Sequence, residues 1–148
     1  VMSAGTGIVH SEYNRTKDPL TFYQIWIETN KQNVEPRWES KKIPTEQASK
    51  LTLLASGYVE DQDKVLFINQ QARIFGGKLA KGTIVEHNIT HQAYVLASNG
   101  LFKMEDNTGS KTGHATMSEG DGAEVTQSKS IILTATTDCE IIIIDTID

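Results

Sequence analysis

Short apolar runs alternate with turn-forming residues along most of the chain. From about Leu51 onward the apolar runs are LTLLAS, KVLFI, ARIF, GTIV, QAYVLA, GLFKM, AEVT, SIILTA and EIIIID. Segments rich in glycine, asparagine, aspartate and serine, such as SGY, FGG, SNG and EGDG, separate them. Short strands divided at close intervals by turn residues are typical of a β-sandwich or β-barrel. The pattern predicts an all-β domain over residues 43–148.

The last of these runs places four isoleucines in a row, at residues 141–144. Successive side chains of a strand point to opposite faces of the sheet, so both faces of this strand should meet apolar material. We therefore predict a central strand of the core near the end of the chain.

The first 50 residues follow a different pattern. PLTFYQIWIET, residues 19–29, carries apolar side chains at both odd and even positions, which predicts a strand over residues 20–27 that is covered on both faces. A polar stretch with Pro36 and Pro44 comes next and favours a connector between two units. We place the boundary so that residues 1–42 and 43–148 form separate units.

Composition narrows the class of protein. The chain has 148 residues, 38% hydrophobic residues and a net charge of −5, which is typical of a soluble globular protein. Its 14 lysines and arginines form no cluster, so we expect no nucleic-acid partner. No apolar run approaches 20 residues, so we expect no membrane partner. Cys139 is the single cysteine and has no partner for an internal disulfide, which favours a cytoplasmic location.

One short stretch carries candidate chemistry. Gly5 and Gly7 supply a tight turn, and the residues after it predict a strand on which His10 and Glu12 are two apart. Side chains at positions i and i+2 of a strand share a face, so an imidazole and a carboxylate could bind one metal ion. A histidine that is hydrogen-bonded to a neighbouring turn is the alternative, and the residues alone leave it open.

The same stretch resembles a known family. The run MSAGTGIVHSEYN, followed by QIWIE, closely resembles the pirin family of bicupins, which includes quercetin 2,3-dioxygenase-like bacterial members. INQQARIFGGKLAKG, HQAYVLASNG, MSEGDGAEV and EIIIIDTI are also similar to that family, so the resemblance spans essentially the whole chain. It implies a cupin jelly roll, with a C-terminal cupin over residues 43–148 and strands left from an N-terminal cupin over residues 1–42.

The resemblance also implies a metal site. In the pirin family, three histidines and one glutamate hold a divalent transition metal, with iron expected first, and His10 and Glu12 match two of these ligands. Glu12 would also act in catalysis, by accepting a proton from the substrate hydroxyl. The family's other two ligands come from an upstream PHPHRG-like segment that these 148 residues lack. Val1 therefore looks like a cut end, and we expect the chain alone to bind metal poorly and to be inactive.

The C-terminal unit is expected to hold no metal of its own. The stretch that resembles the first cupin motif offers His87 but places Ile89 where a second ligand should be, and Ala123 stands at the histidine position of the second motif. We therefore expect His87, His91 and His114 to be surface or turn residues rather than ligands.

The resemblance implies oxygenative cleavage of a flavonol-type substrate such as quercetin by a full-length parent protein. The alternative is a metal-dependent, redox-sensitive protein-binding module that acts in transcription regulation, as in eukaryotic pirins. Arg15, Lys17 and Asp18 follow the motif with mixed charge and favour neither function. A strand over residues 20–27 without sheet partners would leave open edges, so we expect a homo-oligomer formed through the N-terminal strands.

Overall fold

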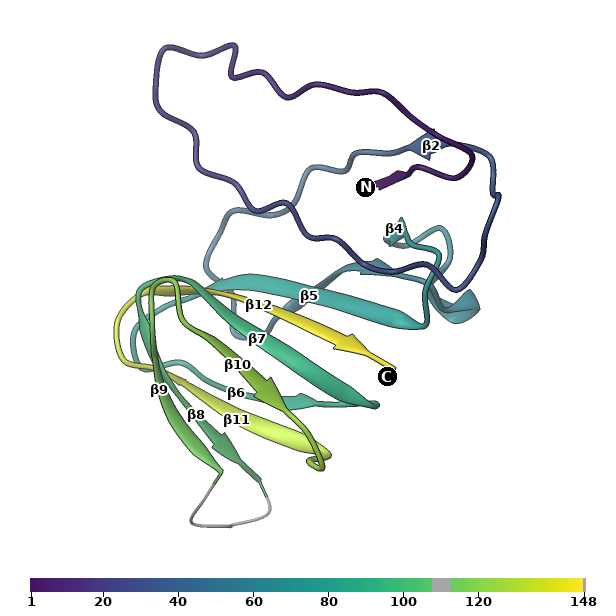
Figure 1. The fold of residues 1–148 in the computed structure, drawn as a ribbon. Coiled ribbons are helices and arrows are strands. Elements are labelled where there is room, and N and C mark those ends of the chain that lie inside the picture. Colours follow the sequence, from purple (N-terminus) through teal and green to yellow (C-terminus); the bar gives the residue numbers. More distant parts are fainter. Residues whose placement is uncertain (108–112, 148) are drawn as a thin grey trace.

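The computed structural model describes residues 1–107 and 113–147, and almost all of its regular structure is β (Figure 1). Its strands are β1 (Met2–Ser3), β2 (Arg37–Trp38), β3 (Thr52–Ser56), β4 (Leu66–Phe67), β5 (Ala72–Leu79), β6 (Ile84–Asn88), β7 (Gln92–Asn99), β8 (Leu101–Asp106), β9 (His114–Ser118), β10 (Gly122–Val125), β11 (Ser130–Ala135) and β12 (Cys139–Thr146). One 3-10 turn, η1 (Val59–Asp61), follows β3.

Two sheets pack face to face in the C-terminal part of the molecule. One has six strands in the order β10-β7-β12-β5-β3-β4, and the other has four in the order β6-β11-β8-β9. Their inner faces bury one core, in which Val95, Phe102, Leu133 and Ile143 are fully enclosed. Figure 1 shows the two layers with the chain crossing between them. The predicted all-β fold, a jelly roll of two sheets, is confirmed.

The run of isoleucines forms a central strand, as predicted. β12 lies between β5 and β7 and pairs antiparallel with both. Cys139, Ile141 and Ile143 face the core and are buried, whereas Ile142 and Ile144 on the opposite face are half-buried. The second face is therefore less completely covered than the four consecutive isoleucines predict.

The N-terminal part is mostly irregular. β1 and β2 form a two-stranded ribbon, and residues 4–36 between them make a long loop that stands away from the sheets (Figure 1). The prediction of a strand over residues 20–27 is wrong, because no strand of the described chain runs beside this segment to accept its backbone hydrogen bonds. Trp26 is consequently 85% exposed, and Phe22 is also exposed.

The N-terminal part contacts the six-stranded sheet around β4 and the residues that follow it. Ile27 packs against a small apolar cluster that includes Leu66 and Ile68. The backbone N–H of Asn30 donates to the carbonyl of Asn69 at 2.9 Å, and the Arg37 side chain donates to the carbonyl of Phe67 at 3.2 Å. The segment between β4 and β5 thus anchors the N-terminal part. The predicted boundary between residues 42 and 43 lies in a segment without regular structure and stays a prediction.

Gly100, in the turn between β7 and β8, is expected to tolerate no side chain. Its φ is +76°, and a Cβ there would lie 2.2 Å from the carbonyl oxygen of Asp138. We expect Gly100→Ala to lower the free energy of unfolding by about 2 kcal/mol. Gly82→Ala is the matched control, because Gly82 has a φ of +85° but open space around it, and we expect a loss of about 1 kcal/mol. Urea denaturation measures both losses of unfolding free energy. Equal losses for Gly100→Ala and Gly82→Ala would show that the close contact of Gly100 with Asp138 adds nothing.

Candidate functional site

A tight turn after β1 sets the position of the predicted metal ligands. The N–H of Gly7 donates to the carbonyl of Ala4 at 2.8 Å, and Gly5 has a φ of +53°. A Cβ on Gly5 would lie 1.9 Å from the carbonyl oxygen of Val34, so glycine is required where the two ends of the loop approach each other. The chain then runs without a strand ladder through His10 and Glu12.

The structure brings His10 and Glu12 together. His10 Nε2 lies 3.8 Å from Glu12 Oε1, and the two side chains are 37% and 57% exposed. The predicted strand at this place is absent, but the spacing of two residues still puts both side chains on the same side of an extended segment. The Glu12 side chain is more than half exposed, so its carboxylate oxygens are accessible to a ligand.

The chemistry of this donor pair fits a first-row divalent metal ion. Imidazole nitrogen and carboxylate oxygen are common ligands of such ions. Adjacent donors at bond lengths of about 2.0–2.2 Å lie roughly 3 Å apart, so a small movement of either side chain would bring both onto one ion. Within residues 1–107 and 113–147, no group of three or more histidines, cysteines, aspartates or glutamates is placed to hold a metal ion. His10 and Glu12 are thus a candidate pair of ligands, and ligation by them stays a prediction.

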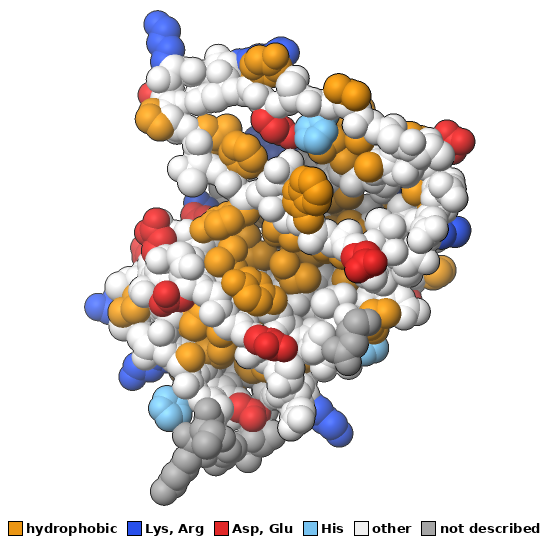
Figure 2. Space-filling model, viewed as in Figure 1, with side chains coloured by type: hydrophobic (Ala, Val, Ile, Leu, Met, Phe, Trp, Pro, Cys, Tyr) orange, Lys and Arg blue, Asp and Glu red, His pale blue; other side chains and the backbone are white. Residues whose placement is uncertain are grey.

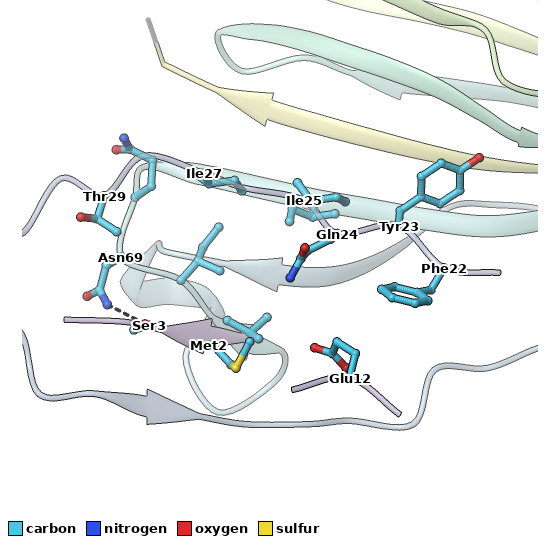
Figure 3. Close-up of a pocket in the computed structure, with 14 residues that line it drawn as sticks. Met2, Ser3, Glu12, Phe22, Tyr23, Gln24, Ile25, Ile27, Thr29 and Asn69 are labelled. Atoms are coloured by element: carbon cyan, nitrogen blue, oxygen red, sulfur yellow. Dashed lines mark hydrogen bonds between the residues drawn. The ribbon is translucent and has the colours of Figure 1, made fainter. Parts of the chain in front are cut away.

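Glu12 also lines a pocket of about 360 Å³ between the N-terminal loop and the six-stranded sheet. Apolar side chains form much of its wall, among them Phe22, Ile25 and Ile27 from the loop. Figure 3 shows Glu12 facing Phe22 and Gln24 across the pocket, with Met2 beside it. A carboxylate at the edge of an apolar pocket can accept a proton or a hydrogen bond from a hydroxyl group on an otherwise apolar ligand.

The C-terminal part supplies the remaining wall. Ile68, Asn69 and Gln70 follow β4, and Ile74 lies on the outer face of β5. Asn69 Nδ2 donates to Ser3 Oγ at 3.1 Å, as Figure 3 shows, and Gln70 Nε2 donates to the carbonyl of Glu28 at 2.9 Å. These side chains hold the pocket together across the two parts. Asn69 and Gln70 belong to the stretch INQQARIFGGKLAKG, which resembles the family, but neither the spacing nor the resemblance indicates a role for them in a pocket.

His87 differs from its prediction as a surface or turn residue. It is 8% exposed on β6, points into the core, and makes an edge-to-face contact with Phe75 at a centroid distance of 4.5 Å. Its Nε2 has no hydrogen-bond partner among the residues that the structure describes. Burial lowers the pKa of His87 below its ordinary value, and the nearby carboxylate of Asp145 opposes that shift only in part. The imidazole is therefore neutral at physiological pH.

The other two histidines are exposed, as predicted. His114 lies at the start of β9, and His91 Nε2 shares a hydrogen bond of 3.0 Å with the hydroxyl of Tyr58. Arg73 stacks on the Tyr58 ring at 4.1 Å and forms an ion pair of 2.8 Å with Asp61. Arg73 also forms an ion pair of 2.6 Å with Glu60, so the guanidinium binds two carboxylates at once.

The chain is similar to a group of named proteins. A family model described as the quercetinase C-terminal cupin domain matches residues 53–146. A Zymomonas mobilis protein, provisionally named a quercetin 2,3-dioxygenase, is 37% identical over 99% of this chain and 60% of its own length. A pirin-like protein of Caulobacter vibrioides is 31% identical over 98% of this chain and 60% of its own length. The quercetin 2,3-dioxygenase of Escherichia coli K12 is 30% identical over 98% of this chain and 59% of its own length. The chain thus spans about three fifths of the length of these relatives.

Solved structures agree on the fold. The crystal structure of YhhW from Escherichia coli has a TM-score of 0.66 and 20% identity, over 82% of this chain and 47% of that one. The bacterial pirin YhhW from Escherichia coli in complex with nickel(II) has a TM-score of 0.66 and 19% identity, over 80% of this chain and 47% of that one. Together with the match to a cupin domain model, this likeness confirms the cupin jelly roll.

Proposed function

Because this chain belongs to the quercetinase C-terminal cupin family, we propose that it forms part of a metal-dependent oxygenase that cleaves a flavonol-type substrate. His10 and Glu12 are two ligands of the metal in this proposal, and the other ligands come from outside the described residues of one chain. The family names of the relatives support the reaction class. The nickel(II) complex of a bacterial pirin supports a first-row divalent metal, for which we keep iron as the first expectation.

The position of Glu12 is the observation that carries this proposal. Its carboxylate lies 3.8 Å from the His10 imidazole, and the same side chain lines the apolar pocket. A residue placed in this way can bind a metal ion and receive the proton of a substrate hydroxyl. The bound ion would supply the redox chemistry that a reaction with dioxygen needs.

The pocket residues would bind and orient the substrate. Phe22, Ile25 and Ile74 offer apolar surface for a flat aromatic ring, and Gln24, Asn69 and Gln70 offer polar groups near its edges. An apolar pocket with a few polar groups is the usual form of a small-molecule site. His10 would bind the metal through a ring nitrogen of its imidazole, which its partly exposed position leaves accessible.

Quercetin binding tests the substrate part of the proposal. We expect saturable binding in calorimetric titration, and we expect Phe22→Asp to weaken it at least tenfold because a charge would replace an apolar wall. Ile84→Asp is the matched control, because Ile84 is 66% exposed on β6 and does not line the pocket. Equal affinities of the two variants, or no saturable binding by the unaltered protein, would contradict the proposal.

Turnover tests the statement that one chain holds an incomplete site. A chain that supplies a single imidazole and a single carboxylate is expected to consume quercetin no faster than the same metal ion free in buffer. Oxygen uptake and loss of quercetin absorbance measure this directly. Catalysis by the metal-loaded chain well above that background would show that the site is complete without further ligands.

A further inference from the structure

The pocket that contains Glu12 has polar groups at two ends. Figure 2 shows apolar side chains gathered between the N-terminal loop and the six-stranded sheet, and the pocket lies between these two parts. Figure 3 shows Ser3, Thr29 and Asn69 at one end of it and Glu12 with Phe22 at the other. Among the described residues that line this pocket, Glu12 alone has a charged side chain. The end opposite Glu12 is therefore polar and uncharged.

Asn69 has hydrogen-bonding groups to spare at the uncharged end. Its half-buried side chain donates from Nδ2 to the Oγ atom of Ser3 at 3.1 Å, and Ser3 itself is only 5% exposed, so the amide is held in place. A side-chain amide has two hydrogens to donate and an oxygen that accepts. Within the described part of the chain, the bond to Ser3 is the one hydrogen bond that this amide makes. Its second hydrogen and its oxygen can therefore bind a ligand.

Two other polar side chains of the pocket wall bind the protein itself. Gln70 donates from Nε2 to the carbonyl of Glu28 at 2.9 Å, and its Oε1 accepts from the N–H of Gln71 at 2.8 Å. The Thr29 hydroxyl donates to the carbonyl of Lys31 at 3.1 Å. These bonds fix the shape of the wall, so Gln70 and Thr29 support the pocket, whereas the neighbouring amide is placed to recognise a ligand.

A ligand that fills this pocket meets a carboxylate at one end and a neutral amide at the other. In the proposed reaction the ligand hydroxyl that loses its proton lies at Glu12. A second hydroxyl or carbonyl group at the far end of the same ligand would lie against Asn69. A pocket that hydrogen-bonds such a group rejects an analogue that lacks it, because the half-buried amide is then left unpaired.

We propose that Asn69 is a specificity-determining residue, which selects ligands with an uncharged hydrogen-bonding group at the end remote from Glu12. The inference rests on the proposed function, because it takes the pocket at Glu12 as the substrate site. It adds a substrate class, which is elongated aromatic molecules with one hydroxyl at the reacting end and another at the far end. Asn69 lies between β4 and β5, so the C-terminal cupin takes part in substrate choice.

Calorimetric titration with quercetin and with unsubstituted flavonol tests this role. Unsubstituted flavonol keeps the hydroxyl beside the ring carbonyl and lacks the outer hydroxyl groups of quercetin. We expect the unaltered protein to bind quercetin about five- to tenfold more tightly, which is the gain from one hydrogen bond to a half-buried amide. Asn69→Leu should bring the ratio of the two dissociation constants close to one, by weakening the binding of quercetin alone.

Two further variants separate recognition of the ligand from support of the wall. Gln70→Leu removes the hydrogen bond to the carbonyl of Glu28 and should weaken the binding of both ligands by the same factor, so that their ratio stays unchanged. Ser3→Ala removes the acceptor that holds the Asn69 amide and should lower the ratio. It also provides the test if Asn69→Leu does not fold.

The other outcomes overturn either this inference or the proposed function. Equal affinities of the unaltered protein for both ligands would overturn the role of Asn69 and leave the proposed substrate site intact. The same holds if Asn69→Leu weakens both ligands equally, or if the preference for quercetin survives in Asn69→Leu and Ser3→Ala. A lack of saturable binding of either ligand by the unaltered protein would overturn the proposed function and, with it, this inference.

Discussion

His87→Leu is expected to raise the free energy of unfolding of the jelly roll and to remove much of its loss of stability in acid. The buried Nε2 has no hydrogen-bond partner in the described part of the chain, and leaving such a group unsatisfied costs about 1–3 kcal/mol, which leucine avoids. Phe75 and the surrounding apolar core can accept the replacement side chain. Urea denaturation followed by circular dichroism at pH 7.5 and at lower pH measures both effects.

The sign of the pH effect follows from the pKa of His87. Burial holds it below the ordinary value of about 6.5 that the unfolded chain has, so between these two values the unfolded chain binds more protons. Stability should therefore be fully present above about pH 6.5 and decline as the pH falls toward the folded-state pKa. The variant should lack this decline. His114→Leu is the control, because His114 is exposed, and an identical pH dependence in wild type and His87→Leu would contradict the account.

Phe102→Ala is expected to cause the largest loss of stability from a single substitution considered for this chain. Phe102 is fully buried on β8, where it pairs with Ala135 of β11 and Met117 of β9. Truncation of an enclosed phenylalanine removes apolar burial and leaves a cavity, which costs about 3–5 kcal/mol. This loss is a large fraction of the free energy of unfolding of a typical domain, which is about 5–15 kcal/mol. Urea denaturation measures this loss of unfolding free energy, provided that the slope of free energy against urea concentration is the same in the variant and the wild type.

Ile84→Ala provides the comparison for this substitution. Ile84 belongs to the same sheet but is 66% exposed, so its truncation should change the free energy of unfolding by no more than about 0.5 kcal/mol. A loss below about 1 kcal/mol for Phe102→Ala would show that the space between the two sheets collapses around the missing ring.

The C-terminal fold was predictable because its strands carry their own pattern. In β12, alternate side chains are buried from Cys139 to Asp145, and Gly82, Gly100 and Gly120 mark turns between other strands. The same alternation predicts that His87 is buried, because it lies at an odd-numbered position between Val85 and Ile89, which are both buried. The prediction of a surface position rests on the polarity of histidine, whereas the alternation of buried and exposed residues along β6 decides its burial.

The N-terminal part was less predictable, for a physical reason. Residues 19–29 have the apolar pattern of a buried strand, but a strand also needs a neighbour that pairs with its backbone, and a local pattern does not report one. His10 and Glu12 were found because a spacing of two residues brings them together. Asn69 and Gln70 were not, because only tertiary contacts with Ser3 and Glu28 bring them to the pocket.

Nuclear magnetic resonance can show whether His10 and Glu12 bind the same metal ion. The four histidines give four imidazole nitrogen spectra, and zinc(II) serves as a diamagnetic probe ion. If both residues bind the ion, the signals of the His10 imidazole respond first and Glu12→Gln weakens this response. The signals of the other three histidines then stay unchanged: His87, His91 and His114. Binding that first moves any other imidazole, or that leaves the His10 signals unchanged at saturation, would contradict this assignment.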